Sequence, residues 1–581
     1  MDNVLEQLGW MGCYQKVQFI LLMLPVVDTA MHMMSFIFIG RNFEHKCAVV
    51  DIPYSTTNDI NSTLSVMYGQ CSVTVTNLSE TIFSSSCKNG YEYSMPQDRS
   101  FLTEWDLVCE KDALSEVTQT VMAVGMMLGS SLFMAMADKY GRKPVFVGSH
   151  ICLFGTAVAL AFAPGYVVFL GLRFFLGAFQ QGVGLISCLM LIELIPTEKR
   201  ALPTQVGCIF WPFSLLLLGF VCYLCRDLSW RHTELVLAAI SVYSLVQWWI
   251  IEESLRWLDV NGKTERAERI IRMAAERNGV DSERVLKLYR DDARPLLLKP
   301  MTKVETDGMN VNGHIDEATL NGSKPPPPQA QDSGTTGDGP DKLVESTAPV
   351  PNSELSFSTF LKNRDIFTLI AINCYIWFAD SVAYYGLIMT SSTLSDNLYL
   401  GYTLNILAEL PAGLALLTLI NRIGRRYSVM VAHLIGGFSL ILATALPNIE
   451  AAAAIPGLSS IIMFISLLGK FGITLGFGVL FLYTPELFPT TIRSTAFGIS
   501  SLAARVGGMI APFSRTLGRH VPWLPGMIFG VLCLIVPILA RYLPETHGYE
   551  LPQTTLDLKL DRSASTKARP IITNGERKRD R

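Results

Sequence analysis

The sequence predicts an all-α membrane protein with twelve transmembrane helices, arranged as two pseudo-symmetric halves of six helices each. Three observations lead to this fold class. The 581 residues contain twelve apolar runs, each near the ~20 residues that a helix needs to cross bilayer hydrocarbon. A polar stretch over 252–364 separates the first six runs from the last six. Short motifs that flank the runs of the first half recur in the second half.

The composition agrees with a membrane protein. Hydrophobic residues make up 50% of the chain and charged residues 17%, whereas an average soluble domain has about 25% charged residues. Helices are expected because bilayer hydrocarbon satisfies no backbone hydrogen bond. The runs lie at 16–39, 116–137, 144–164, 166–192, 202–224, 233–252, 365–388, 398–420, 428–447, 455–484, 494–514 and 522–542.

Basic residues on alternate loops predict the orientation. Cytoplasmic loops of membrane proteins carry an excess of Lys and Arg. We therefore expect a multi-pass protein of the plasma membrane with a cytoplasmic N-terminus over 1–15, helical halves over 16–251 and 365–542, and a cytoplasmic tail over 543–581. The N-terminus lacks the basic region and cleavage site of a signal peptide, so the first run is expected to remain as a helix. The net charge of −3 indicates no particular partner, and no nucleic-acid partner is expected.

The loop over 40–115 is expected to be extracellular. It carries two glycosylation acceptors, Asn61 and Asn77. It also carries four cysteines, Cys47, Cys71, Cys87 and Cys109. In an oxidising compartment an even cysteine count in a short loop predicts disulfides, here two, with all three pairings open. The other eight cysteines are expected to be apolar packing residues.

The central stretch over 252–364 has two parts. Residues 253–292 have apolar positions at helical spacing among many charges, which predicts short amphipathic helices along the inner membrane face. Residues 300–351 are rich in Gly, Pro, Ser and Thr, which predicts a disordered linker. Its prolines, Pro325 to Pro328, are a possible docking segment for an SH3-type partner, although a plain spacer is the favoured interpretation.

Three motifs occur once in each half. Asp138-Lys-Tyr-Gly-Arg-Lys returns as Asn421-Arg-Ile-Gly-Arg-Arg, and Glu193-Leu-Ile-Pro-Thr returns as Glu486-Leu-Phe-Pro-Thr. Glu252-Glu-Ser after the sixth run returns as Pro544-Glu-Thr after the twelfth. Such repeats indicate an internal duplication. Carriers built this way bind substrate near the midplane, where the halves meet.

The charges in these motifs predict a cytoplasmic gate. Acidic and basic groups at helix ends can pair when the inner side is closed and separate when it opens. The alternative is that they only set the topology, but a topological signal would not need acidic partners. The gate residues are Asp138, Arg142, Glu193, Arg200, Arg425, Glu486 and Arg493.

The same motifs carry a family resemblance. The paired Gly-Arg loops and the Glu-Leu-x-Pro-Thr ends resemble the major facilitator superfamily. Thr103-Glu-Trp-Asp-Leu-Val-Cys109 and Pro544-Glu-Thr-His-Gly-Tyr resemble its organic cation, anion and carnitine transporters, closest by motif to the carnitine branch. The resemblance implies the major facilitator fold and transport of small organic ions by alternating access, either secondary active or facilitative. Met134 and Asn421 depart from the superfamily pattern.

Ionisable residues within membrane helices are costly and each is a candidate site residue. The resemblance places Glu409 near the cation site of the family and Arg505 where anion and carnitine carriers have arginine. Opposite charges suit a zwitterion, whose carboxylate can pair with the guanidinium. The alternative is that both residues pair with other protein groups. Asp28 and His32 are expected to satisfy each other, and Arg173 to be a structural ion-pair residue.

Other candidates complete the predicted substrate site. Aromatic rings attract an ammonium group, and the family's cavity helices here carry Trp211, Trp377, Tyr384 and Phe471, together with the ionisable Asp380 and Lys470. The resemblance also associates Gln180 with sodium coupling.

Transport is the predicted activity. No nucleotide loop, nucleophile elbow or metal-binding Cys/His cluster is found in the sequence, so an enzyme is disfavoured. No cofactor and no metal are expected beyond Na+ or H+ as a coupling ion. The partners are the lipid bilayer and a small organic ion, with carnitine-type zwitterions or cations favoured. An organic anion exchanger and a transporter-like receptor that binds without transport remain as alternatives.

Overall fold

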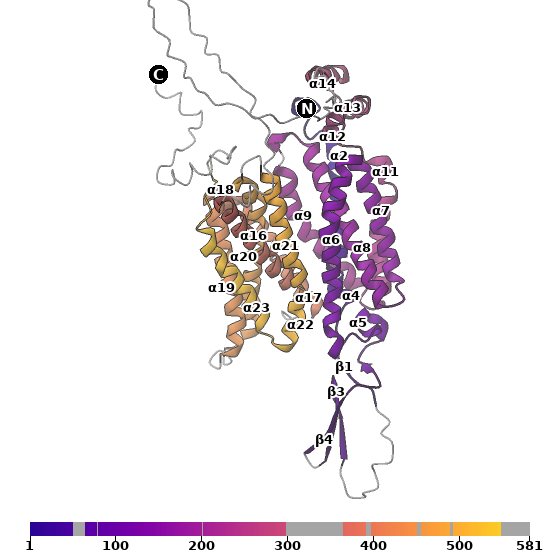
Figure 1. Ribbon diagram of the computed structural model, residues 1–581, viewed down its shortest axis with the longest axis vertical. Coiled ribbons are helices and arrows are strands. Elements are labelled where there is room, and N and C mark those ends of the chain that lie inside the picture. The colour runs from indigo at the N-terminus through magenta and orange to yellow at the C-terminus, as the bar shows by residue number, and fades with distance from the viewer. Residues whose placement is uncertain are drawn as a thin grey trace, which may run out of the picture.

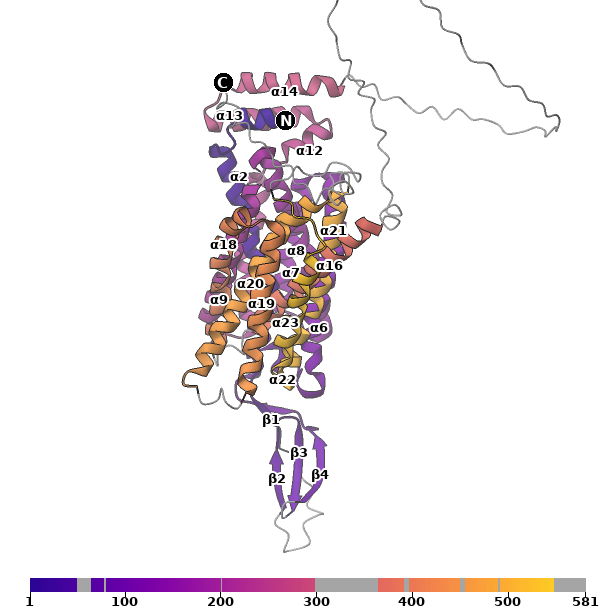
Figure 2. The ribbon, with the colours of Figure 1, turned by 90° about the vertical axis from the view of Figure 1, so that its left-hand side faces the viewer.

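The helices form a long bundle with additional structure at both ends (Figures 1 and 2). The computed structural model describes residues 1–49, 64–77, 80–199, 201–297, 364–390, 397–449, 455–488 and 492–547. Strands β1 to β5 lie at one end, here called the strand end. Short helices α12 to α14 lie at the other end, here called the linker end (Figure 1).

The first half follows the predicted order of helices. Its first span is broken into α2 (Cys13–Met23), α3 (Pro25–Met34) and α4 (Phe36–Ile39), with Pro25 at the first position of α3. Proline is tolerated there because the first helical N–H has no partner within the helix. The remaining helices are α6 (Asp112–Tyr140), α7 (Arg142–Ala161), α8 (Tyr166–Leu194), α9 (Ala201–Leu224), α10 (Trp230–Ile240) and α11 (Gln247–Ile250).

The second half repeats this arrangement. Two of its spans are divided, one into α17 and α18 and the other into α21 and α22. Its helices are α16 (Arg364–Met389), α17 (Leu398–Leu407), α18 (Glu409–Arg422), α19 (Arg425–Ala445), α20 (Leu458–Leu487), α21 (Arg493–Ile510), α22 (Phe513–His520) and α23 (Leu524–Ala540).

Twelve apolar helical segments therefore occupy the twelve predicted positions. Within the described residues, ten are long and apolar enough to cross a membrane, and two shorter ones cover Ile209–Leu224 and Leu524–Ala540. Large apolar side chains face outward, such as Val167, which is 78% exposed, and Phe464, which is 67% exposed. Water would oppose such exposure, whereas lipid does not. The predicted fold class is confirmed.

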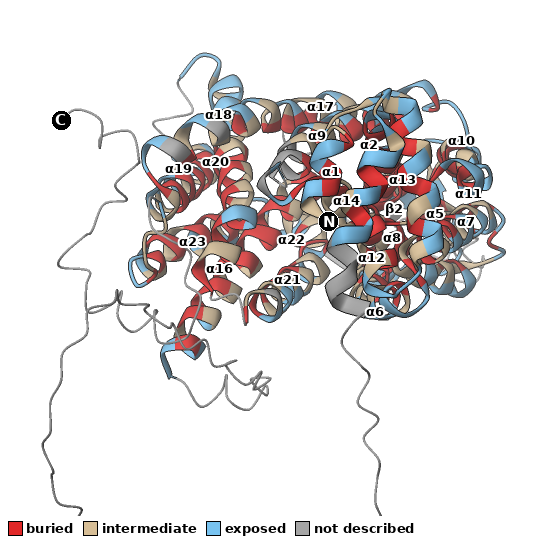
Figure 3. Cartoon of the chain, turned by 90° about the horizontal axis from the view of Figure 1, so that it is seen from above, coloured by how far each residue is buried: buried red, intermediate tan, exposed pale blue. Residues whose placement is uncertain are grey.

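The two halves lie side by side, each with buried residues in its interior (Figure 3). The halves meet at two places, and at each place one helix of the first half contacts a divided span of the second half. α6 of the first half contacts α21 and α22, and α9 contacts α17 and α18. Gly125 and Gly177 let α6 and α8 approach closely within the first half, because a Cβ atom at Gly125 would lie 2.0 Å from the Phe174 carbonyl oxygen.

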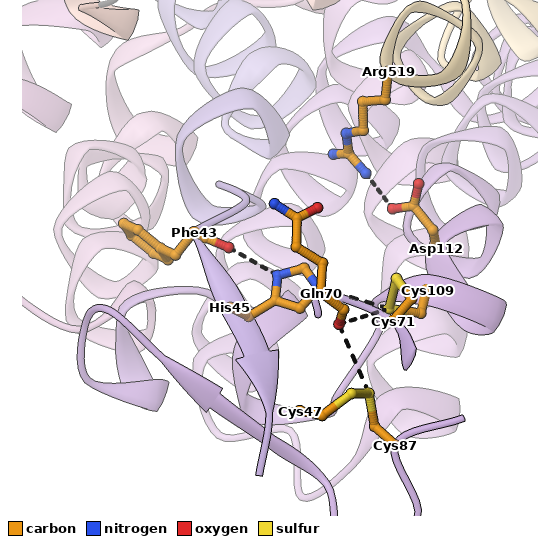
Figure 4. Close-up of a disulfide and its surroundings, with 9 residues drawn as sticks. All are labelled: Phe43, His45, Cys47, Gln70, Cys71, Cys87, Cys109, Asp112 and Arg519. Atoms are coloured by element: carbon orange, nitrogen blue, oxygen red, sulfur yellow. Dashed lines mark hydrogen bonds and ion pairs between the residues drawn. A yellow bond between two sulfur atoms is a disulfide. The ribbon is translucent and has the colours of Figure 1, made fainter. Parts of the chain in front are cut away.

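The strand end contains structure that the sequence analysis did not predict. β1 (His45–Cys47) pairs with β5 (Tyr91–Tyr93), and β2 (Leu64–Tyr68), β3 (Ser72–Asn77) and β4 (Glu80–Ser86) form a second antiparallel sheet. Disulfides join Cys47 to Cys87 and Cys71 to Cys109 (Figure 4). Of the two glycosylation acceptors, Asn77 ends β3, whereas Asn61 lies outside the described residues.

The linker end carries a small helical cluster. α1 (Asp2–Gln7), α12 (Leu255–Val260), α13 (Thr264–Asn278) and α14 (Ser282–Leu297) bury a common apolar core. The helices predicted over 253–292 are present. Their apolar sides pack against one another and against α1. The segment over 300–351, including Pro325 to Pro328, lies outside the described residues.

The cluster is anchored to the first half by polar contacts. The Asn278 side chain donates to the Leu8 carbonyl at 2.7 Å and accepts from the Tyr14 N–H at 2.9 Å. The Asp2 carboxylate lies 2.5 Å from the Arg256 guanidinium. Burial opposes ionisation of Asp2, but hydrogen bonds from Thr197 and Arg256 lower the pKa of Asp2 to about 2. The N-terminal segment is therefore part of the folded first half.

Candidate functional site

At the linker end, the predicted gate residues form one ion-paired group in each half. In the first half, Arg142 lies 2.9 Å from the Asp138 carboxylate and 3.3 Å from the Glu193 carboxylate. In the second half, Arg425 lies 3.1 Å from the Glu486 carboxylate. Each arginine also donates to the end of the preceding helix, Arg142 to the Ala137 carbonyl oxygen at 2.9 Å. Each of these contacts joins helices within one half.

A glutamate caps the third helix of each half. The Glu253 carboxylate accepts the N–H groups of Arg142 at 2.9 Å and Lys143 at 3.1 Å. The Glu545 carboxylate accepts the N–H of Arg425 at 2.8 Å. A carboxylate at a helix N-terminus satisfies free N–H groups and the helix dipole. Burial raises the pKa of Glu253, and the N–H groups that it accepts oppose that rise.

Glycine precedes each capped helix for a steric reason. Gly141 has φ +115°, and a Cβ atom there would lie 2.5 Å from the Glu253 carboxylate oxygen. Gly424 has φ +87°, and a Cβ atom there would lie 2.8 Å from the Glu545 carboxylate carbon. The Gly-Arg motif thus combines a positive φ with close approach of an acid. The sequence analysis used the motif containing Glu253 and Glu545 as a sign of duplication but did not assign these residues to the gate.

The other gate residues differ in placement. Arg493 donates to the Phe488 carbonyl oxygen at 3.2 Å, and Arg200 lies outside the described residues. Among the described gate residues, no ion pair joins Asp138, Arg142 or Glu193 to a residue of the second half. Pairing across the halves, as the gate hypothesis expects for the inward-closed state, is therefore absent between these residues here.

Polar contacts do join the halves at the strand end. Arg519 of α22 forms an ion pair with Asp112 of α6 (Figure 4). The Thr120 hydroxyl donates to the Met509 carbonyl at 2.9 Å, and the Tyr402 hydroxyl donates to the Leu215 carbonyl at 3.1 Å. The halves are thus held together at the end opposite to the gate residues.

A buried polar group lies in the middle of the bundle. Glu409 and Lys470 form an ion pair of 2.9 Å with side-chain exposures of 1% and 0%. The Tyr384 hydroxyl donates to Glu409 at 2.9 Å and accepts from the Trp211 indole N–H at 2.9 Å. Lys470 Nζ also lies 3.5 Å from the centre of the Tyr384 ring. Four predicted substrate residues are therefore in mutual contact, and Trp211 brings the first half to this group.

Arg505 has a different environment. Its guanidinium donates to Gln181 Oε1 of the first half at 2.8 Å. No carboxylate of the described residues lies within ion-pair distance of Arg505, whereas Glu409 has Lys470 as an internal cation. The ionised forms of these three residues sum to one positive charge. The sequence analysis paired Glu409 with Arg505 by charge and did not predict Gln181 as a partner of Arg505.

Two predicted substrate residues lie away from this central group and have protein partners of their own. Asp380 is fully buried and lies 3.0 Å from Nε2 of His433 on α19, so its carboxylate already has a partner. Trp377 is 2% exposed, packs on Phe477, Phe481 and Phe497, and donates to Thr484 at 2.9 Å. Both residues belong to the interior of the second half and not to its junction with the first.

Phe471 and Gln180 also lie inside one half. Phe471 packs on a small apolar cluster with Ala412, Ala432 and Leu475. Gln180 donates to the Thr29 carbonyl at 2.6 Å. The Gln180 Oε1 atom is buried without a hydrogen-bond partner in the described chain.

The expected Asp28–His32 pair is wrong. Asp28 instead lies 3.0 Å from Nε2 of His150 on α7 and accepts from the Tyr243 hydroxyl at 2.6 Å. An aspartate of the first helix therefore pairs with a histidine of the third helix in both halves, Asp28 with His150 and Asp380 with His433. Arg173 is buried and donates to the His32 carbonyl at 3.4 Å.

Comparison with known proteins agrees with this architecture. The model of the Major Facilitator Superfamily matches residues 113–512. The chain belongs to this superfamily. Xenopus laevis solute carrier family 22 member 6-B is 28% identical over 573 residues, covering 95% of this chain and 93% of the relative. The human organic cation/carnitine transporter 2 is 26% identical over 578 residues, covering 95% and 93%.

Further relatives are also transporters. A Drosophila melanogaster organic cation transporter-like protein is 28% identical over 570 residues, covering 96% of this chain and 92% of the relative. Among solved structures, the inward-open xylose transporter XylE from E. coli has a TM-score of 0.57 at 14% identity, covering 94% and 98%. This similarity shows the fold. The chain is a membrane transporter and not an enzyme, and several of its curated relatives are named as organic cation, organic cation/carnitine or organic anion transporters.

Proposed function

We propose that the protein moves carboxylate-bearing organic ions across the plasma membrane by alternating access. The observation that supports this substrate class is Arg505, a guanidinium at the junction of the halves with no carboxylate partner among the described residues. Arginine can hold a carboxylate through two parallel hydrogen bonds. A carnitine-type zwitterion would place its ammonium towards the Tyr384 ring and Glu409.

A second candidate is transport of organic anions. Lys470 already neutralises Glu409, so the central residues carry a surplus positive charge that an anion would balance. The curated relatives include organic anion transporter 3 from human at 26% identity. The two candidates differ in whether an ammonium on the substrate improves or weakens transport.

The orientation is part of the proposal. The linker end is cytoplasmic, both termini are inside, and the strand end is extracellular with glycans at Asn61 and Asn77. The ion pairs around Arg142 and Arg425 act as the inner gate and bias an equilibrium between two states. In the state described here, the halves are joined at the outer side. Na+ or H+ remains the proposed coupling ion.

Uptake into proteoliposomes tests the substrate class. Labelled carnitine, benzoate and tetraethylammonium represent a zwitterion, an anion and a cation. Arg505→Ala should weaken transport of carboxylate substrates by about ten- to a hundredfold, because a charge-assisted hydrogen bond contributes about 1.5–3 kcal/mol. Transport of tetraethylammonium should change little.

Arg541→Ala is the matched control, since Arg541 is exposed at the end of α23. Carnitine and benzoate uptake that Arg505→Ala leaves intact, in protein shown to be folded, would make Arg505 a structural residue. Surface binding without accumulation inside the vesicles would contradict transport of these compounds.

A further inference from the structure

A cavity of about 650 Å³ opens at the strand end, separate from the buried group around Glu409. It lies where helices of both halves end. α4 and α9 contribute from the first half, and α16, α17 and α22 from the second. Its lining residues are Ile37, Arg41, Asn42, Tyr223, Arg226, Met389, Thr390, Asn397, Leu398, Tyr399, Arg515, Gly518 and Arg519.

The charge of this lining has one sign. Among the described residues it contains four arginines and neither Asp nor Glu. An excess of Lys and Arg is expected in cytoplasmic loops, so the orientation signal does not explain arginines at the end proposed to be extracellular. A cleft lined by one sign of charge concentrates ions of the opposite sign.

Two of the arginines belong to the contact between the halves. Arg519 pairs with Asp112, and Arg515 donates to the Gly40 carbonyl at 2.6 Å. Each still has a buried guanidinium nitrogen without a hydrogen-bond partner in the described chain, Nη1 of Arg515 and Nη2 of Arg519. Buried donors of this kind normally have a partner. These two arginines therefore add positive charge to the wall of the cavity, and the donors for a ligand come from the other two.

The other two arginines are held mainly by aromatic rings. Arg41 lies 5.1 Å from the ring centre of Phe43 and donates to the Tyr399 hydroxyl at 3.2 Å. Arg226 lies 4.5 Å from the ring centre of Tyr223. Its acidic partner is the neighbouring Asp227, which is 78% exposed, and such an exposed pair is weak. Both guanidinium groups retain donors for a ligand.

We propose that this cavity is an outer anion-binding vestibule that captures organic anions before they reach Arg505. The guanidinium groups would bind a carboxylate or sulfate through paired hydrogen bonds. The rings of Tyr223 and Tyr399 would pack on a flat, apolar ligand body. The ligand class is thus an aromatic carboxylate or aryl sulfate. The binding site stands on the cavity and its charges, and only its place in a transport path rests on the proposed function.

Binding of benzoate to the purified full-length protein in nanodiscs of neutral lipid tests the vestibule. The measurements use the Arg505→Ala chain, so that the central arginine does not contribute. Adding Arg41→Gln and Arg226→Gln should raise the Kd on the order of tenfold or more. Increasing ionic strength should also raise the Kd, because partly exposed charges are screened by salt.

Two further variants separate loss of the site from loss of the fold. Lys46→Gln removes a positive charge from β1 without altering the cavity lining, and should leave the Kd unchanged. Arg41→Lys with Arg226→Lys keeps both charges but not the paired geometry, and should give an intermediate Kd.

Three results would overturn the vestibule. The first is that the Arg505→Ala chain does not bind benzoate. The second is that the Kd stays unchanged when Arg41 and Arg226 are both replaced by glutamine. The third is that Lys46→Gln raises the Kd as much as the two arginine substitutions do. Failure of the proposed function is a different result. It would appear as missing uptake in proteoliposomes while equilibrium binding of benzoate at the vestibule persists.

Discussion

At the scale of single residues, the ion pair between Glu409 and Lys470 carries a clear energetic consequence. Both side chains are almost completely buried and lie 2.9 Å apart. Removing one partner of such a pair leaves an uncompensated buried charge, which costs about 3–5 kcal/mol. Replacing both partners by uncharged groups of similar size costs much less.

We therefore predict that Glu409→Gln lowers the thermal stability of the purified protein strongly. The double variant Glu409→Gln with Lys470→Met should recover much of this loss. Thermal unfolding of the two variants provides the measurement, with Glu276→Gln on the exposed side of α13 as the control. Equal stability of Glu409→Gln and the wild type would mean that Lys470 is satisfied without Glu409.

For single residues, the sequence predicts candidate site residues but not their contact partners. Glu409 and Lys470 are predicted as site residues because ionisable groups within membrane helices are costly, and Tyr384 because an aromatic ring on a cavity helix attracts an ammonium group. Their partners could not be predicted, because partners depend on the rotation of each helix about its axis. Asp380 illustrates the difficulty, since its ionisable side chain predicts a site equally well but faces His433 within the same half.

At the scale of the element, the start of the third helix in each half depends on a glycine and a distant glutamate. We predict that Gly141→Ala and Gly424→Ala each lower stability and uptake. A non-glycine residue at positive φ costs about 1–2 kcal/mol, and the added Cβ would push the capping carboxylate away. Melting temperature and carnitine uptake of the purified variants provide the measurements.

Gly148 offers the matched control within α7. A Cβ atom at Gly148 meets nothing within 4 Å, and alanine favours a helix more than glycine does. Gly148→Ala should therefore be neutral or slightly stabilising. Similar losses for Gly141→Ala and Gly148→Ala would show that the glycine at the helix start has no special role.

Elements were predicted with uneven success, for physical reasons. The transmembrane helices follow from length and hydrophobicity, because the bilayer allows few alternatives. The strands β2 to β4 were missed, although Ser72–Asn77 alternates Val with Ser and Thr, because the extracellular loop was judged by its cysteines and acceptor sites. The amphipathic helices were predicted, but their packing on α1 was not, since 1–15 was taken as a simple tail.

At the scale of the whole molecule, the contacts between the halves describe one arrangement, in which the halves are joined at the strand end. Arg519 and Asp112 join α22 to α6 at the strand end, while the described gate residues pair within their own halves. Sequence patterns predict the gate groups but not which end is joined, because the proposed alternating access requires both arrangements of one sequence.

We predict that Asp112→Asn favours opening at the strand end. Cys222 is 2% exposed, and its carbonyl accepts from the Tyr399 hydroxyl across the halves at 3.3 Å. In a Cys225→Ser background, a membrane-impermeant maleimide added outside intact cells should label Cys222 faster after Asp112→Asn. Glu92→Gln on β5, an exposed acid of the same end, is the control. An unchanged labelling rate would show that the Asp112–Arg519 pair does not hold this end closed.

The disulfide between Cys71 and Cys109 has a further consequence at this scale. Cys109 precedes α6 by a few residues, and α6 begins with the aspartate that holds Arg519 (Figure 4). The small sheet is thus covalently tied to the start of α6. If the proposed orientation and alternating access hold, a fluorophore or antibody fragment bound to its strands would report movements of α6 from outside the cell.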